Sequence, residues 1–344
     1  MENNRADSVQ GCTSLVETAL HEPCHTRWGA KPFQPPRLQD FCEAAVRIKG
    51  VAVRTPLMPL HSYNGSNGVY LKPEVLQPVT SFKLRGVYNW ASCLPPDRRS
   101  EGLYTISAGN TAQAIGYVAN LFGVPSKTFL PDTVPPNKVE AVKSYGLDVE
   151  MIPLKDYFTW EPEQDCNGCF LHPFAEPMMI AGNGTIGLEI IEDLPDVDTV
   201  YVPVGGGGLV NGIGRAVKAI KPDVRIVGVQ PENYPALSTS LNEGGPVKVD
   251  MKQTISDGVA APIIDVMFPH LKEILDEQVT VSEFQIKQAV KRLALRNKLV
   301  VEGAGALSVA AAMKDSKERR GKTVCILSGG SIDHDKLSSI LNNP

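Results

Sequence analysis

Residues 199–220 read TVYVPVGGGGLVNGIGRAVKAI, and this stretch decides the fold class. Its first part, Thr199–Val204, is a short β-branched run that predicts a buried strand, and Leu209–Ile220 has the periodicity of a helix. Four consecutive glycines join the two parts. A strand that turns directly into a helix is the unit from which parallel sheets covered by helices are built.

The glycine turn, Gly205, Gly206, Gly207 and Gly208 followed by Leu209, also carries a chemical signal. Consecutive glycines cost conformational entropy, so we do not expect a packing reason alone. Their N–H groups at the start of a helix form a cradle for an anion, whereas the alternative is a flexible turn. The run fits neither the G-x-G-x-x-G dinucleotide pattern nor a P-loop, because no Gly-Lys-Ser/Thr follows.

Short β-rich runs alternate with helical patterns over most of the chain after residue 103. Such alternation predicts parallel sheets with helices on both faces. The strands suffice for two open, twisted sheets, so we expect a large domain (38–101 plus 177–344) and a small mobile domain (102–176), after a flexible tail (1–37). The predicted strands are 103–107, 127–130, 148–152, 199–204, 224–229 and 323–327, and the predicted helices are 38–48, 110–122, 135–145, 184–191, 209–220, 282–296 and 303–313.

The bulk composition is that of a globular protein and gives no sign of nucleic acid or membrane as a partner. Of the residues, 42% are apolar and 21% are charged, and the net charge is −4. No apolar run approaches the roughly 18 residues that a membrane span needs. The N-terminal residues lack the basic start and apolar block of a secretion signal. We therefore expect a cytoplasmic location, with no nucleic acid and no membrane among the partners.

Seven cysteines are scattered along the chain, which argues against a secreted disulfide scaffold. Cys166 and Cys169 form a single C-x-x-C pair. No second pair of cysteines or histidines in the sequence completes a metal site, so we favour two loop thiols over a metal or redox site.

The stretch SFKLRG, residues 81–86, places Lys83 between an aromatic residue and an Arg-Gly pair. A lysine amine becomes reactive when burial or a nearby cation lowers its pKa, and it then condenses with an aldehyde to give an imine. The alternative for a single lysine is a solvated surface side chain. The motif therefore makes Lys83 a candidate nucleophile.

Two further turns follow predicted strands. The first, SAGNT at residues 107–111, leads into a helix, and its hydroxyl, amides and helix N-terminus suit a carboxylate, although a simple helix cap has the same pattern. The second, LSGGS at residues 327–331, contains Ser328. The Ser328 hydroxyl can hydrogen-bond a ring nitrogen without carrying a charge, although a plain turn has the same composition.

Taken together and in this order, the four motifs resemble the threonine/serine dehydratase (ammonia-lyase) family of fold-type II, tryptophan synthase beta-like, pyridoxal-phosphate enzymes. The resemblance covers roughly residues 38–335. Supporting stretches are RTPL (54–57), LPD (130–132), PNKV (136–139), HPF (172–174), GTIGLE (184–189), SDG (256–258) and EGAGA (302–306).

The resemblance implies pyridoxal 5′-phosphate as the cofactor, bound as an imine by Lys83, and a small amino acid as the substrate. Phe82 would pack against the cofactor ring, and Asn110 would bond its 3′ oxygen. Gly205 to Leu209 would hold the phosphate. Ser328 would face the pyridine nitrogen, and Glu302 would lie nearby. The residues expected around the substrate are Ser81, Ser107, Ala108, Gly109, Asn110 and Thr111.

The implied reaction is an α,β-elimination on a β-hydroxy amino acid. The freed amine of Lys83 would remove the α-proton, the β-hydroxyl would leave, and the products would be a 2-oxo acid and ammonia. The resemblance also implies a homodimer. The alternatives are another β-elimination or β-replacement, an amino-acid racemase, or a relative that binds the cofactor or a partner without catalysis.

Several positions depart from the family pattern. Thr111 stands where histidine is usual, and Ser331 stands where asparagine is usual. Ala108 replaces the serine of related serine racemases, and a methyl group cannot deliver a proton, which disfavours racemisation. Gln230 and Ala236 stand where the metal site of that group has carboxylates, so we expect no tightly bound metal.

Overall fold

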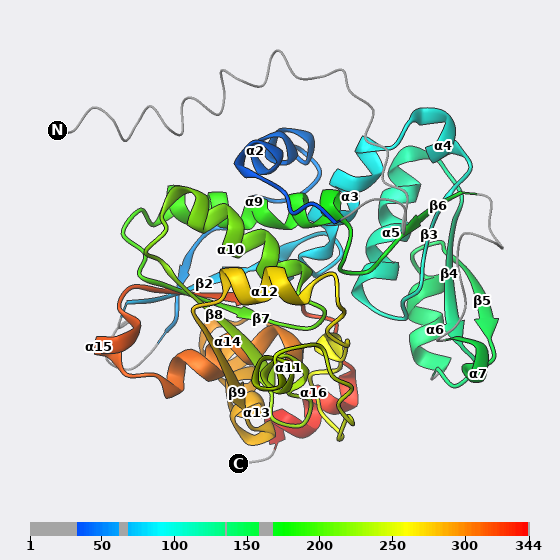
Figure 1. The fold of residues 1–344 in the computed structure, drawn as a ribbon. Helices are drawn as coiled ribbons and strands as arrows, with labels where there is room; N and C mark the ends of the chain where they lie inside the picture. The colour runs from blue at the N-terminus through cyan, green and yellow to red at the C-terminus, as the bar shows by residue number, and fades with distance from the viewer. Residues whose placement is uncertain (1–32, 62–67, 135, 158–167, 343–344) are drawn as a thin grey trace.

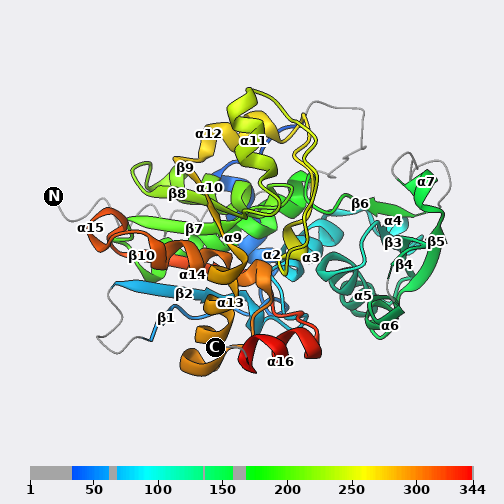
Figure 2. The same cartoon turned by 90° about the horizontal axis from the view of Figure 1, so that it is seen from below.

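The computed structural model describes residues 33–61, 68–134, 136–157 and 168–342, and these contain two parallel sheets (Figures 1 and 2). The larger sheet has the strand order β1-β2-β10-β7-β8-β9. Its neighbouring strands are parallel except that β1 pairs antiparallel to β2. The strands are β1 (Met58–Pro59), β2 (Val69–Pro73), β7 (Thr199–Pro203), β8 (Arg225–Pro231), β9 (Glu277–Val281) and β10 (Thr323–Leu327).

The smaller sheet has the order β5-β4-β3-β6, is parallel throughout, and lies to the right of the larger sheet in Figure 1. Together the two sheets confirm the predicted fold class of parallel sheets with helices on their faces. The elements of this part are β3 (Leu103–Thr105), β4 (Ser126–Pro131), β5 (Asp148–Ile152), β6 (Cys169–Leu171), α4 (Pro96–Ser100), α5 (Asn110–Phe122), α6 (Pro136–Lys143) and α7 (Leu154–Tyr157).

Helices cover both faces of the larger sheet. Successive residues of a strand point to opposite sides, and here the residues on both sides are apolar and need cover. In β7, Val200 and Val202 pack on the side of α9 and α10, whereas Tyr201 packs on the side of α13 and α14. The first side carries α9 (Pro177–Asp193), α10 (Gly208–Ile220) and α12 (Phe268–Ile274), with α2 (Leu38–Arg47) on top of α9 and α10. The second carries α13 (Glu283–Arg292), α14 (Gly303–Lys314) and α16 (His334–Asn342). The remaining elements are η2 (Glu74–Leu76), α3 (Lys83–Cys93), α11 (Ala236–Glu243), η3 (Asp257–Val259), η4 (Leu293–Asn297) and α15 (Lys317–Arg320).

Two elements next to the site are not predicted by sequence periodicity. These are the strand β2 and the helix α3, which carry Lys72 and Arg85 at buried positions. A charged residue at a buried position breaks the apolar pattern from which strands and helices are predicted. The helix α9 is also longer than the predicted 184–191, because it begins at Pro177 with Glu176 as its N-cap.

The core of the smaller sheet includes residues from outside the range 102–176. Leu84 and Trp90 of α3 pack in the same hydrophobic cluster as Leu103 and Ile115. The helix α3, which begins at Lys83, therefore packs against the smaller sheet's helix α5 as well as against α9. The division of the chain at 101/102 and 176/177 into a large and a mobile small domain stays a prediction, and most of the expected flexible tail lies outside the described residues.

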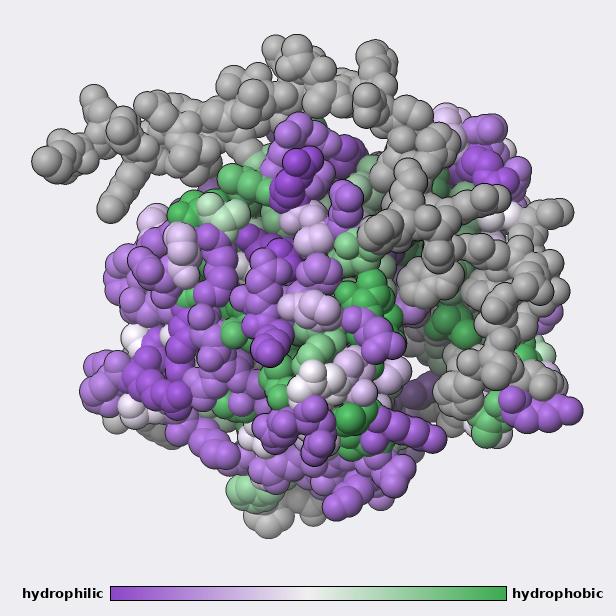
Figure 3. Space-filling model, viewed as in Figure 1, coloured by the Kyte–Doolittle hydropathy of each residue, from purple (hydrophilic) through white to green (hydrophobic). Residues whose placement is uncertain are grey.

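The visible surface is mainly hydrophilic. Figure 3 shows hydrophilic residues over most of the face turned to the viewer, with hydrophobic residues in separate patches between them. Among the helices of the described ranges, none combines the length and the apolar character that crossing a bilayer requires.

Candidate active site

The segment before Lys83 pairs with the loop that follows β10. The N–H of Phe82 donates to the carbonyl oxygen of Ser328 at 3.0 Å, and the N–H of Gly330 donates to the carbonyl oxygen of Thr80 at 2.9 Å. Lys83 begins α3 directly after this short ladder. The backbone therefore fixes two predicted site residues, Lys83 and Ser328, on neighbouring segments.

The amine of Lys83 is held by a backbone carbonyl. Its Nζ donates a 2.6 Å hydrogen bond to the carbonyl oxygen of Pro173 and lies 5.2 Å from the centroid of the Phe82 ring. In the part of the chain that the structure describes, no carboxylate forms an ion pair with it. Burial lowers the pKa of Lys83 to about 8. An amine with this pKa is partly uncharged near neutral pH, so it is available as a nucleophile or a base.

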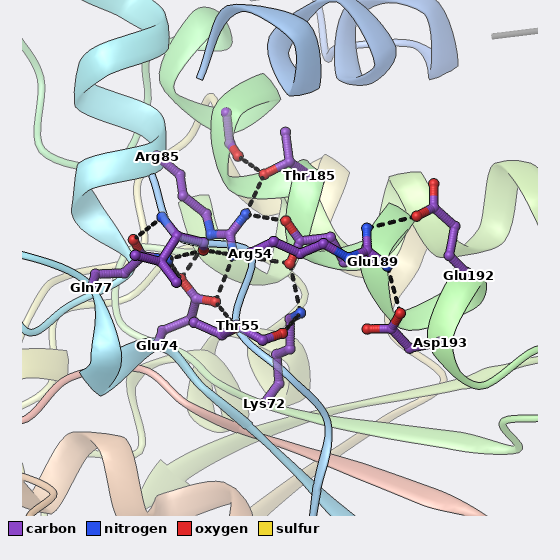
Figure 4. Close-up of polar contacts among 12 residues, drawn as sticks. Arg54, Thr55, Lys72, Glu74, Gln77, Arg85, Thr185, Glu189, Glu192 and Asp193 are labelled. Atoms are coloured by element: carbon purple, nitrogen blue, oxygen red, sulfur yellow. Dashed lines mark hydrogen bonds and ion pairs between the residues drawn. The ribbon is translucent and has the colours of Figure 1, made fainter. Parts of the chain in front are cut away.

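Two residues further on, Arg85 lies in a buried ionic cluster (Figure 4). Its guanidinium contacts Glu74 at 2.8 Å and Glu189 at 2.6 Å. The Nζ of Lys72 pairs with Glu189 at 2.6 Å. Two positive and two negative side chains thus lie together, and each has a partner of opposite charge, which buried charges require. We call these four side chains the Arg85 cluster.

The Arg85 cluster joins four elements, since Glu74 is the first residue of η2. Lys72 lies in β2 and Glu74 directly follows that strand, while Glu189 lies in α9 and Arg85 lies in the first turn of α3. Burial opposes the charge of Glu74, but Arg85 outweighs this effect and holds the pKa of Glu74 below its usual value. The cluster therefore anchors the helical turn from which the Lys83 side chain extends. In addition, Thr55 and Gln77 donate hydrogen bonds to Glu74. Arg85 donates to the Thr185 hydroxyl and to the Val53 carbonyl oxygen.

The glycine run follows β7 and opens α10. The N–H groups of Gly205, Gly206 and Gly207 have no acceptor among the described residues. N–H groups in this position, next to the positive end of a helix, form a cradle that suits a phosphate.

Packing also requires glycine in this run. A Cβ on Gly206 would lie 2.3 Å from the ring of Phe174, and a Cβ on Gly208 would lie 2.5 Å from the Phe174 carbonyl oxygen. Gly207 has a φ of 96°, a backbone conformation that favours glycine. Leu209 follows and is buried. Close contact with Phe174 is thus a reason for the glycines that the sequence pattern does not indicate.

Two buried polar atoms at the site lack a hydrogen-bond partner within the described ranges, namely Ser81 Oγ and Asn110 Oδ1. The amide nitrogen of Asn110 is used, since it donates to Glu302 Oε1 at 2.9 Å. A buried polar atom without a partner costs free energy unless a bound group satisfies it. These two atoms therefore point to a ligand with polar atoms of its own.

Glu302 lies buried at the N-cap of α14, next to Gly329. A Cβ on Gly329 would lie 2.4 Å from Glu302 Oε1 and 3.0 Å from Asn110 Nδ2. Burial and the charge of Asp257 raise the pKa of Glu302 to about 7, although the bond from Asn110 acts in the opposite direction. Glu302 is therefore protonated in a large fraction of molecules near neutral pH.

The turn between β3 and α5 contains the remaining predicted substrate residues. Ser107 Oγ accepts the N–H of Gly109 at 3.2 Å, and Gly109 is the N-cap of α5. Asn110 is the first helical residue, Thr111 is buried behind it, and Ala108 lies within the turn. The first N–H groups of a helix have no intrahelical acceptor, so this end of α5 suits a carboxylate.

The contacts bring the predicted residues together. Pro173 contacts Lys83, and the next residue, Phe174, contacts the glycine run. Gly329, which follows Ser328, contacts both Asn110 and Glu302. A lysine amine, N–H groups without acceptors and two unpartnered polar atoms fit a cofactor that has an aldehyde, a phosphate and a polar ring. The residues present therefore fit pyridoxal phosphate.

The stretch 172–174 contributes more to the site than its sequence indicates. His172 Nδ1 accepts the N–H of Ala175 at 3.1 Å. Burial, together with the charge of Lys83, lowers the pKa of His172 to about 3, so this imidazole stays neutral. Pro173 contributes only its backbone carbonyl, and a pattern of side chains gives no signal for such a contact. The available signal for the segment, though not for the contact, was the HPF stretch (172–174) of the family resemblance.

Two expectations about cysteines and metals stay predictions. Cys166 lies outside the described residues, whereas Cys169 is buried and its Sγ donates to the carbonyl oxygen of Arg98 at 3.4 Å. The amide of Gln230 bonds the Val204 carbonyl and the Leu237 N–H. The described ranges bring no three His, Cys, Asp or Glu side chains together as metal ligands.

Comparisons with known proteins agree on one kind of enzyme. A family model described as "Pyridoxal-phosphate dependent enzyme" matches residues 48–329. An L-threonine ammonia-lyase from Geobacter sulfurreducens is 39% identical over 307 residues, which cover 87% of this chain and 76% of that protein. The solved structure of maize serine racemase has a TM-score of 0.83 and 30% identity, covering 89% of this chain and 97% of that one. The solved structure of a threonine deaminase from T.th. has a TM-score of 0.80 and 35% identity, covering 87% and 99%.

Proposed function

The chain belongs to the family of pyridoxal-phosphate-dependent enzymes, and from this premise we propose that it is an ammonia-lyase for L-threonine. The reaction would convert L-threonine to 2-oxobutanoate and ammonia. The observation that carries the proposal is the Lys83 amine, which is buried, is held by the Pro173 carbonyl and lies beside segments that carry unpartnered polar atoms. We infer L-threonine as the substrate from relatives that are named for threonine.

When bound, pyridoxal phosphate supplies an aldehyde that condenses with amines and a ring that takes up the electron pair left on the substrate's α-carbon. The N–H groups of residues 205–209 would hold its phosphate, and Phe82 would pack against its ring. Ser328 would meet the pyridine nitrogen with a neutral hydroxyl, which leaves that nitrogen without a proton. Asn110 and Glu302 would lie at the ring oxygen, where Asn110 Oδ1 is without a partner.

Lys83 is the residue that would hold the cofactor, through Nζ, until the amino acid binds. Its free Nζ would take the proton from the α-carbon. The pKa of about 8 favours this role, because the uncharged amine is populated at neutral pH. The Pro173 carbonyl would orient Nζ, and the first turn of α5, with Ser107, Asn110 and Thr111, would hold the substrate carboxylate. Ser81, Ala108 and Gly109 would line the same place.

The substrate is tested by incubating the purified protein, with added pyridoxal phosphate, with L-threonine, L-serine and bulkier β-hydroxy amino acids. Ammonia and the 2-oxo acid are measured, and Lys83→Ala is the control. We expect the highest kcat/KM for L-threonine and no product from Lys83→Ala. The absence of any 2-oxo acid would contradict the proposed ammonia-lyase activity. A clear preference for another amino acid would contradict threonine as the substrate.

A racemase is the second candidate, because a serine racemase is among the similar structures. Ala108 argues against it, since its methyl group offers no proton to the face of the substrate opposite Lys83. Chiral analysis of serine recovered from the incubation separates the two activities. We expect 2-oxo acid without D-serine, and D-serine formed at a comparable rate would favour the racemase. A β-replacement enzyme would instead form a new amino acid only when a nucleophile is added.

We also propose a cytoplasmic homodimer as the working form. Exposed apolar side chains on the larger-sheet part, such as Val53, Leu76, Leu295 and Val300, suit contact with a second copy. Sedimentation at micromolar concentration tests the dimer, and fractionation of the source cells tests the location. A monomer, or a protein in the membrane fraction, would contradict this form.

A further inference from the structure

Thr80, three residues before Lys83, has an unusual backbone conformation. Its φ is 53°, in the left-handed region, and Lys298 is the one other non-glycine residue with a positive φ in the described part of the chain. A left-handed backbone crowds the Cβ of any L-residue, and a β-branched side chain makes this worse. Such strain persists only where the surrounding structure imposes it.

The surrounding structure does impose this turn. The N–H of Thr80 donates to the carbonyl oxygen of Gln77 at 2.7 Å, and the Thr80 carbonyl accepts the N–H of Gly330 at 2.9 Å. The next residue, Ser81, lies opposite Gly329 in the ladder that leads to Lys83. Glycine would adopt this backbone without strain. The backbone alone therefore does not explain a threonine here, and the reason lies in its side chain.

The side chain of Thr80 begins a link to the smaller sheet. Thr80 Oγ1 lies 3.3 Å from Ser331 Oγ, and Ser331 Oγ donates to Gln113 Oε1, also at 3.3 Å. Because the proton of Ser331 goes to Gln113, the Thr80 hydroxyl is the donor to Ser331. We call these three side chains the hydroxyl link.

The hydroxyl link ends in the first turn of α5. Gln113 is buried, and its N–H donates to the carbonyl oxygen of Gly109, the N-cap. The same turn contains Asn110 and Thr111, which the proposed function assigns to the substrate carboxylate. The link therefore connects the segment of the reactive lysine with the helix end that would grip the substrate.

We propose that Thr80 is a positioning residue, whose hydroxyl sets the first turn of α5 relative to Lys83 through Ser331 and Gln113. The proposal rests on the proposed function for its consequence, which is the fit of the substrate carboxylate. Loss of the link leaves the chemistry of Lys83 intact but loosens the carboxylate site. KM for the amino acid therefore rises more than kcat falls.

Four variants distinguish the effect of the Thr80 hydroxyl from the effect of its strained backbone. Thr80→Gly removes both, Thr80→Val keeps the β-branched strain without the hydroxyl, Thr80→Ser keeps the hydroxyl, and Ser331→Ala breaks the link at its centre. We expect KM for L-threonine to rise roughly three- to tenfold in Thr80→Gly, Thr80→Val and Ser331→Ala, with kcat within about twofold. Thr80→Ser keeps the wild-type KM, because it keeps the hydroxyl. The double variant Thr80→Gly/Ser331→Ala shows no further rise, because both changes break one link.

We expect thermal stability to rank these variants in a different order from KM. Thr80→Gly raises the thermal midpoint by a few degrees because it relieves the backbone strain, whereas Thr80→Val does not. A more stable Thr80→Gly variant with a weakened carboxylate site is the pattern that distinguishes positioning from a general contribution to the fold.

Amide hydrogen exchange in the substrate-free protein tests the link without turnover. We expect exchange at Gln113 and the next residues of α5 to be roughly threefold faster or more in Thr80→Gly, Thr80→Val and Ser331→Ala, and unchanged in Thr80→Ser. Unchanged exchange in the three variants overturns the proposal, whatever the activity. An altered exchange with an unaltered KM also overturns it. If the wild-type protein shows no lyase activity, the proposed function fails, and the exchange alone then decides for or against the link.

Discussion

Lys83 Nζ donates a 2.6 Å hydrogen bond to the carbonyl oxygen of Pro173, and these two residues come from different parts of the fold. Lys83 begins α3, whereas Pro173 follows the last strand of the smaller sheet. A carbonyl oxygen accepts a hydrogen bond from the charged and from the neutral amine. When the amine is neutral, the nitrogen lone pair stays available for reaction. The contact thus orients the amine without fixing a positive charge on it.

The depressed pKa of Lys83 predicts how the cofactor-free protein takes up pyridoxal phosphate. Only the uncharged amine attacks the aldehyde. Since burial lowers the pKa of Lys83 from 10.5 to about 8, the rate of reconstitution should rise with pH and level off above about 8, rather than above 10.5. Stopped-flow absorbance of imine formation measures this rate. A rate that keeps rising to pH 10 would show an ordinary, solvated lysine.

Glu302 should make stability fall as the pH rises from about 4.5 to 7. Its folded-state pKa is raised to about 7, so the folded state binds more protons than the unfolded state in this window, and deprotonation favours unfolding. Glu302→Gln resembles the protonated form and keeps an acceptor for Asn110. We expect the variant to match the wild type at pH 5 and to be more stable at pH 8 in urea unfolding. A variant that is equally destabilised at both pH values would contradict this prediction.

Arg85→Met should destabilise the protein by about 3–5 kcal/mol, because it leaves Glu74 buried without its main partner. Arg54→Met is the matched control. Arg54 also pairs with two carboxylates, Glu192 and Asp193, but its side chain is 50% exposed, so we expect a loss of less than about 1 kcal/mol. Denaturant unfolding of the two variants measures the difference. Equal losses would show that the burial of the Arg85 cluster does not matter.

Gly206→Ala should weaken both the fold and the binding of the cofactor. The new Cβ would lie 2.3 Å from the Phe174 ring, so the glycine run or Phe174 must shift, at a cost of about 1–3 kcal/mol. Gly245→Ala, where no atom lies within 4 Å of the added Cβ, should change stability by less than about 1 kcal/mol. Unfolding and titration with pyridoxal phosphate measure the two effects. Tight cofactor binding by Gly206→Ala would show that this loop does not hold the phosphate.

The sequence predicts those parts of the fold that local patterns encode. Thr199–Pro203 and the helix after the glycines are predicted because a β-branched run, a glycine turn and a helical period follow one another within 22 residues. The strand β2 and the helix α3 are not predicted, because Lys72 and Arg85 place charges at their buried positions. These charges are paired with Glu74 and Glu189, and Glu189 lies more than a hundred residues away in the sequence.

The candidate site shows the same division. Lys83, the glycine run and Asn110 are indicated by motifs, although their roles stay predictions. The Pro173 carbonyl is a backbone group and leaves no trace in residue type. The left-handed backbone of Thr80 is equally hidden, because threonine gives no sign of a conformation that normally calls for glycine.

The most direct test of the central claim is to reduce the purified protein with borohydride in the presence of pyridoxal phosphate and to map the pyridoxyl group by peptide mass spectrometry. The account predicts one label per chain, on Lys83, and its loss in Lys83→Ala. A label on another lysine, or no label on a folded protein, would contradict it.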